Sequence, residues 1–131
     1  MNDPSAPLAE IERIARETVA ALPAPFATAA REVVLRVEDL PDAQMLAELD
    51  IDDPLELTGL YEGVPITRKS VSWPHPYPDT VWLFRLPILA ELETRDGVTL
   101  EQLVAHVTIH EFAHHFGWSD GDIASIDRWW E

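Results

Sequence analysis

The stretch "TLEQLVAHVTIHEFAHHFGWSD", residues 99–120, decides the fold. It predicts a helix from Thr99 to Phe116, because Thr99 followed by Gln102 fits a capping box and Gly117 ends the pattern. Apolar residues occur nearly all round this helix, which predicts burial on more than one side. They are Leu100, Leu103, Val104, Val107, Ile109, Phe112 and Phe116. Imidazoles and a carboxylate in such a setting are costly without partners, so they need an explanation.

The end of this helix has the residue spacing of a metal site. His110 and His114 are one turn apart on one face, so their imidazoles can converge on a cation at about 2.0–2.1 Å, the usual zinc–nitrogen distance. Glu111 is rotated by about 100° from His110, so we expect it to reach a water on the metal rather than the metal itself. Two ligands and one base are what the H-E-x-x-H pattern supplies.

The pattern continues beyond the helix as H-E-x-x-H-x-x-G-x-x-D. Gly117 allows a sharp turn after the helix, and the chain can then return Asp120 as a third, oxygen ligand. Two alternatives remain open. Asp120 can instead cap a final helix over "DIASIDRWWE", residues 122–131, and Asp122 can be the ligand in its place.

The other three histidines receive different interpretations. His115 points about 100° away from the adjacent candidate ligand His114, which favours packing or support of a ligand over catalysis. His106 lies one turn before His110, but ligands at i, i+4 and i+8 span about 12 Å of rise, too far for one ion. His75 and Tyr77 lie in the proline-rich "SWPHPYPD" and are candidates for a substrate or oxyanion contact.

Length and composition define the class of protein. The 131 residues fit one domain spanning 1–131, in which residues 1–7 are expected to fray. There are no cysteines, so a metal must be held by histidine and carboxylate. The start has no secretory signal pattern and no run is long enough for a membrane span, which favours a cytoplasmic protein of a bacterium-like cell. The net charge of −15 argues against binding to nucleic acid or anionic lipid, and serves solubility or the steering of cationic peptides.

The remaining pattern predicts a small sheet flanked by helices, in one α+β domain. The expected elements are an amphipathic helix over 8–22, a strand through 33–37, a short helix or loop over 42–50, a hairpin within 55–70 that turns near Gly63, a loop over 71–80, a strand over 80–86, and a helix over 87–97 ended by Gly97.

With these residues the sequence resembles the zincin metallopeptidases, and specifically the small bacterial zincin-like family with the extended motif. "GLYEGVP", residues 59–65, is also similar to that family. The resemblance implies a minimal zincin fold, a small mixed or antiparallel sheet packed against a backing helix and a buried active-site helix. "TVWLFRL", residues 80–86, is then the candidate for the antiparallel edge strand at the cleft. The resemblance also implies one zinc ion per chain, held by His110, His114 and Asp120, with Glu111 as the catalytic base.

Two features depart from the larger zincins. The only methionines, Met1 and Met45, precede the motif, so no Met-turn follows it. No tyrosine or histidine follows His115, so an oxyanion donor would have to come from upstream. The candidates are His75, Tyr77, Tyr61 and Arg85.

The leading hypothesis is therefore a zinc-dependent peptidase that acts on a peptide or protein substrate, with Glu111 as general base. The missing downstream donor motivates an alternative, a zinc-binding module with weak or no proteolysis that acts as a binding or regulatory protein. In a third hypothesis the zinc is structural and joins the terminal helix to the helix that carries the motif.

Overall fold

The computed structural model describes residues 6–22, 26, 30–63 and 79–116, with side chains as far as His114. The chain order of its elements is α1 (Leu8–Ala20), β1 (Val34–Glu38), α3 (Ala43–Glu48), the 3₁₀ helix η1 (Pro54–Glu56), β2 (Gly59–Glu62), β3 (Thr80–Phe84), α4 (Arg85–Glu93) and α5 (Leu100–Phe116). The predicted α+β class is confirmed. Within the described residues, no helix is long and apolar enough to cross a membrane.

The three strands form one mixed sheet in the order β1-β3-β2. β1 pairs with β3 in parallel, and β2 pairs with β3 antiparallel. Side chains alternate between the two faces of a strand, so the register decides which residues share a face. On one face Val81 lies between Leu35 and Tyr61, and Leu83 lies between Val37 and Gly59.

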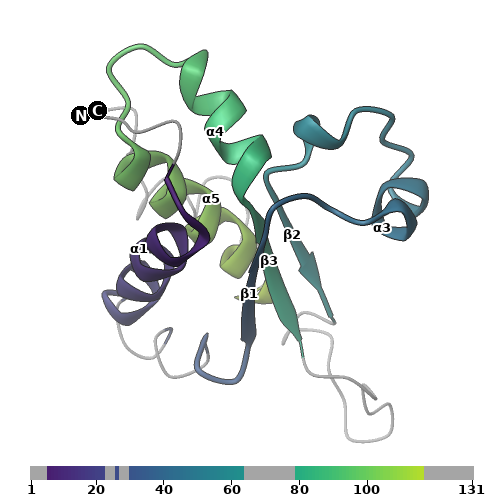
Figure 1. Ribbon diagram of the computed structural model, residues 1–131. Coiled ribbons are helices and arrows are strands. Elements are labelled where there is room, and N and C mark those ends of the chain that lie inside the picture. The colour runs from purple at the N-terminus through teal and green to yellow at the C-terminus, as the bar shows by residue number, and fades with distance from the viewer. Residues whose placement is uncertain (1–5, 23–25, 27–29, 64–78, 117–131) are drawn as a thin grey trace, which may run out of the picture.

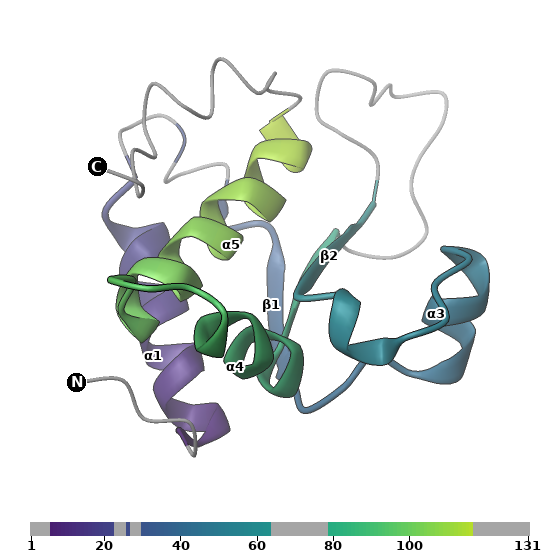
Figure 2. The same ribbon diagram turned by 90° about the horizontal axis from the view of Figure 1, so that it is seen from above.

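α1 and α5 cover this face of the sheet, and α3 lies on the other side (Figures 1 and 2). The amphipathic helix α1 buries Ile11, Ile14 and Ala15, while α5 buries Leu103 and Val104. These side chains form one core with the buried residues of β3. Burial of apolar area on both sides of α5 therefore fixes the position of the helix that carries the histidines.

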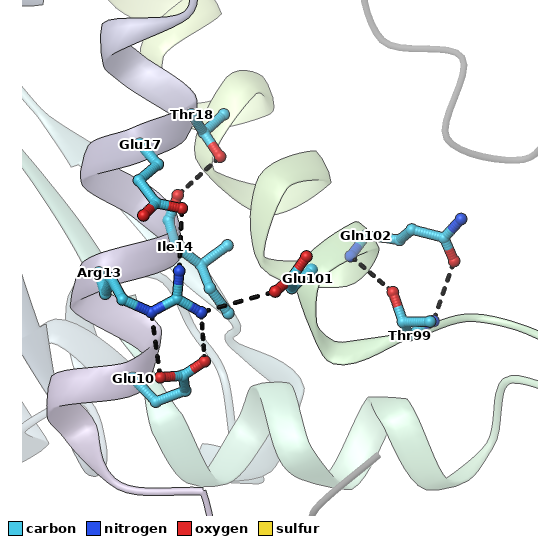
Figure 3. Close-up of polar contacts among 8 residues, drawn as sticks. All are labelled: Glu10, Arg13, Ile14, Glu17, Thr18, Thr99, Glu101 and Gln102. Atoms are coloured by element: carbon cyan, nitrogen blue, oxygen red, sulfur yellow. Dashed lines mark hydrogen bonds and ion pairs between the residues drawn. The ribbon is translucent and has the colours of Figure 1, made fainter. Parts of the chain in front are cut away.

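The start of α5 is set by the predicted capping box, which is confirmed (Figure 3). The Gln102 backbone N–H donates to Thr99 Oγ1 at 3.1 Å, and the Thr99 N–H donates to Gln102 Oε1 at 2.9 Å. Arg13 of α1 also lies 3.5 Å from Glu101 of α5. That ion pair is exposed and adds little stability, so the capping box and the core hold the helix.

The prediction that residues 80–86 form an edge strand is wrong. β3 is the central strand, pairs on both sides, and ends at Phe84 where α4 begins. Val81, Leu83 and Phe84 are each 0% exposed, whereas Thr80 and Trp82 are half-buried. Among the described strands, β2 is instead the antiparallel edge strand.

Three smaller expectations also need correction. The helix predicted over 87–97 starts at Arg85 and ends at Glu93, where the Thr94 hydroxyl donates to the Glu91 carbonyl at 2.7 Å. Residues 55–57 are not a strand of a hairpin but belong to η1 and the link to β2, and the second arm expected within 64–70 lies outside the described residues. Ala6 is not frayed, since it is 1% exposed and its carbonyl accepts a hydrogen bond from Arg85.

Candidate metal centre

Two imidazoles meet at the C-terminal end of α5. The ring centroids of His110 and His114 are 5.4 Å apart, and the ring planes make an angle of 71°. This follows from the i, i+4 spacing, which places both side chains over the same strip of the helix surface. The sequence prediction that these two residues share one face is therefore confirmed.

Glu111 reaches the same place by a different spacing. Its carboxylate Oε1 lies 3.3 Å from Nδ1 of His114, because residues at i and i+3 are also neighbours on a helix. Only 12% of the Glu111 side chain is exposed, against 49% for His114. The carboxylate is thus largely sheltered from solvent beside an accessible imidazole. Glu111 is rotated away from His110 around the helix, but it remains close to His114.

The edge strand β2 packs directly on this part of α5, and Gly59 permits the close approach. A Cβ at Gly59 would lie 2.9 Å from Val107 Cγ1 and 3.0 Å from Glu111 Cγ. Both distances are shorter than ordinary van der Waals contact, so only glycine fits without a shift. The backbone of β2 and the Glu111 side chain are therefore in contact.

Tyr61 extends from the same strand towards the histidines. Its ring centroid is 6.4 Å from that of His114 in an edge-on arrangement. Its hydroxyl donates a hydrogen bond of 2.9 Å to Asp79 Oδ2. Burial of the phenol, helped by the bond to Asp79, raises the pKa of Tyr61 well above its usual value. The sequence marked Tyr61 only as one of several oxyanion candidates, and no pattern indicated its contact with His114.

The other predicted site residues fall into two groups. Arg85 lies at the opposite end of β3 from Tyr61, where its Nε donates to Asp39 at 2.7 Å, so it does not join the site. His106 is the next histidine along the strip, with its ring centroid 6.0 Å from that of His110. The remaining candidates lie outside the residues or side chains that the structure describes, and they are His75, Tyr77, His115, Asp120 and Asp122.

The residues that are described fit a zinc ion. Two neutral imidazoles at i, i+4 are typical zinc ligands, and a nearby carboxylate can orient an imidazole or contact a water on the metal. Between residues 6 and 116, with the gaps stated above, no group of three or more potential ligands is found. Asp120, the third ligand expected from the sequence, lies outside these residues.

A comparison with protein families finds a match that covers most of the chain. The family of zincin-like metallopeptidases matches residues 30–130, a span that includes the sheet, α5 and the whole extended motif. The chain therefore belongs to the zincin-like metallopeptidase family. A comparison with individual curated proteins gives no match.

Proposed function

We propose that the protein is a zinc-dependent peptidase in which His110 and His114 hold the metal and Glu111 is the general base. The observation that carries the proposal is the cluster at the end of α5, two imidazoles 5.4 Å apart with a sheltered carboxylate 3.3 Å from one of them. Membership of the zincin-like family supports it.

Each residue of the cluster has a separate task in this proposal. His110 and His114 supply neutral nitrogen ligands, and Asp120 supplies the oxygen ligand. Zinc bound there would lower the pKa of a water and polarise the scissile carbonyl. Glu111 would take the proton of the attacking water and pass it to the leaving amine. The Glu111 carboxylate is sheltered from solvent, and charges act more strongly in such a low-dielectric setting. Its attraction for the proton of the water is therefore strengthened.

The edge of β2 offers a place for the substrate. One side of β2 is hydrogen-bonded to β3, and among the described strands the other side has no partner. An extended peptide can add to such an edge through its main chain. Because Gly59 brings this strand into contact with Glu111, a peptide on the edge would pass beside the proposed base.

One observation favours the alternative function, a zinc-binding module with weak proteolysis. Two of the four upstream oxyanion candidates are engaged elsewhere, since Tyr61 donates to Asp79 and Arg85 donates to Asp39. Loss of one oxyanion donor typically lowers kcat by about 10²–10³. Slow turnover with tight zinc binding would support this alternative.

The test uses purified protein, a quenched peptide library, and a chelator followed by zinc. Chelation should stop cleavage and zinc should restore it. His110→Ala and His114→Ala should bind zinc at least about tenfold more weakly and lose cleavage. His106→Ala is the matched control, the same residue type one turn away on the same helix, and should keep both. Cleavage that survives chelation, or His106→Ala behaving like His114→Ala, would contradict the proposal.

A further inference from the structure

Tyr61 is held at both ends of its side chain. Its ring lies on the helix-facing side of the sheet, opposite Val81, and meets the His114 ring edge-on at 6.4 Å. Its hydroxyl is bonded to Asp79 at 2.9 Å. Edge-on aromatic contacts are favourable beyond the area that they bury. The tyrosine therefore connects a proposed zinc ligand to Asp79, the residue that precedes β3.

Asp79, which anchors the Tyr61 hydroxyl, is itself held in place. Asp79 is 3% exposed, and its backbone carbonyl accepts a hydrogen bond of 2.9 Å from the N–H of Val34, at the start of β1. Gly63 leaves room for the pair, since a Cβ there would clash with Asp79 Oδ1 and lie 2.9 Å from the Tyr61 hydroxyl. Gly63 also has a φ of +155°, a backbone conformation that residues other than glycine rarely adopt. Glycine at position 63 therefore leaves room for the hydrogen bond between Tyr61 and Asp79.

His114 is the ligand that most needs such support. Half of its side chain is exposed, in the last turn of α5 that the structure describes, so its ring is not confined by the core. Besides the His110 ring, its neighbours are Tyr61 on β2 and Glu111 on its own helix. A ligand held in its bound orientation loses less freedom when it takes up the metal.

We infer that Tyr61, anchored by Asp79, is a positioning residue that orients His114 for zinc. The inference rests on the proposed function, in which His114 is a ligand. It differs from the oxyanion role considered from the sequence, because the Tyr61 proton is committed to a buried carboxylate rather than aimed at a substrate. Tyr61 acts here through His114 and touches neither substrate nor reacting atoms.

The test measures metal binding directly. Zinc affinity is obtained by competition with a chromophoric chelator, and the visible spectrum of the cobalt-substituted protein reports ligand geometry. Tyr61→Ala should raise the zinc Kd about two- to tenfold, the worth of one aromatic contact, and change the cobalt spectrum. Tyr61→Phe keeps the ring but loses the anchor and should fall between wild type and Tyr61→Ala.

Leu60→Ala is the matched control for zinc affinity. Leu60 is the neighbouring residue of β2, but it is opposite Trp82 and so points to the other face of the sheet. It should leave the Kd and the spectrum unchanged, which separates positioning from general loosening of the strand. If Tyr61→Ala does not fold, Tyr61→Leu and Tyr61→Phe carry the same comparison.

The outcomes separate this inference from the proposed function. Wild-type protein that binds no zinc, or His114→Ala with wild-type affinity, would overturn both. Loss of affinity in His114→Ala together with wild-type Kd and spectrum in Tyr61→Ala would overturn the positioning role alone. An equal loss in Leu60→Ala and Tyr61→Ala would also overturn it, because the effect would then belong to the strand.

Discussion

Replacement of Gly59 by alanine should disturb the proposed base through a single methyl group. The added Cβ would lie 2.9 Å from Val107 Cγ1, 3.0 Å from Glu111 Cγ and 3.2 Å from the Trp82 carbonyl oxygen. Val107 is buried and the carbonyl belongs to the paired strand, so neither can move aside freely. The strand and helix must separate by about half an ångström to reach ordinary contact distance.

Two magnitudes follow from that separation. Overpacking of this kind destabilises a fold by about 1–3 kcal/mol. A misplacement of about 1 Å can lower catalysis about 10²-fold, so a shift of half that size should lower kcat/KM by roughly tenfold. We would measure the free energy of unfolding in urea and kcat/KM on the best library peptide, with zinc occupancy matched.

Gly97→Ala is the control for lost stability alone. Gly97 has a φ of +75°, and a methyl group added there would meet no atom within 4 Å, so alanine adds backbone strain of about 1–2 kcal/mol without a clash. The Gly97→Ala variant should be destabilised like Gly59→Ala but should keep the wild-type kcat/KM. Equal loss of activity in the two variants, or unchanged stability in Gly59→Ala, would refute the reasoning. Val107→Ala in the Gly59→Ala background should recover part of the loss, as a double-mutant cycle would show.

Three further outcomes are expected. Phe112→Ala, at a side chain 2% exposed, should lower the free energy of unfolding by about 3–5 kcal/mol, read from urea melts. Thr99→Ala removes one bond of the capping box and should lower it by about 1 kcal/mol in the same assay. Burial and the bond to Asp79 raise the pKa of Tyr61 above its usual 10.0, so the stability from this group is complete below about pH 10 and lost as the pH rises further. Tyr61→Phe should therefore lose less stability than wild type between pH 9 and pH 11, and equal losses would contradict this.

The sequence predicted the helices and strands themselves better than it predicted which of them lie side by side. Hydrophobic period and capping residues are local, so α1, β1, α5 and the capping box could be recognised. Strand order depends on long-range pairing, and the connection between β2 and β3 gave no signal for it. Thr80 and Trp82 alternate with the buried Val81 and Leu83, and such alternation reports which face of the sheet is covered, not whether the strand is central or at the edge.

The candidate site shows the same division. His110 and His114 lie on one helix, so their spacing alone predicted that their rings meet. The contact of Tyr61 with His114 joins a strand to a helix 53 positions away in sequence, which no local pattern encodes. Gly59 likewise lies within the segment predicted as a hairpin, and only the packing of β2 on α5 explains why a glycine is needed there.

Turnover and bound zinc measured in the same samples of wild type and Glu111→Gln test the central claim most directly. Glutamine keeps the size of the side chain but cannot accept the proton. The account predicts about one zinc per chain in both proteins, and a kcat/KM on peptide that is lower in Glu111→Gln by at least about 10². Glu111→Gln with full zinc and wild-type cleavage, or wild type without zinc, would contradict it.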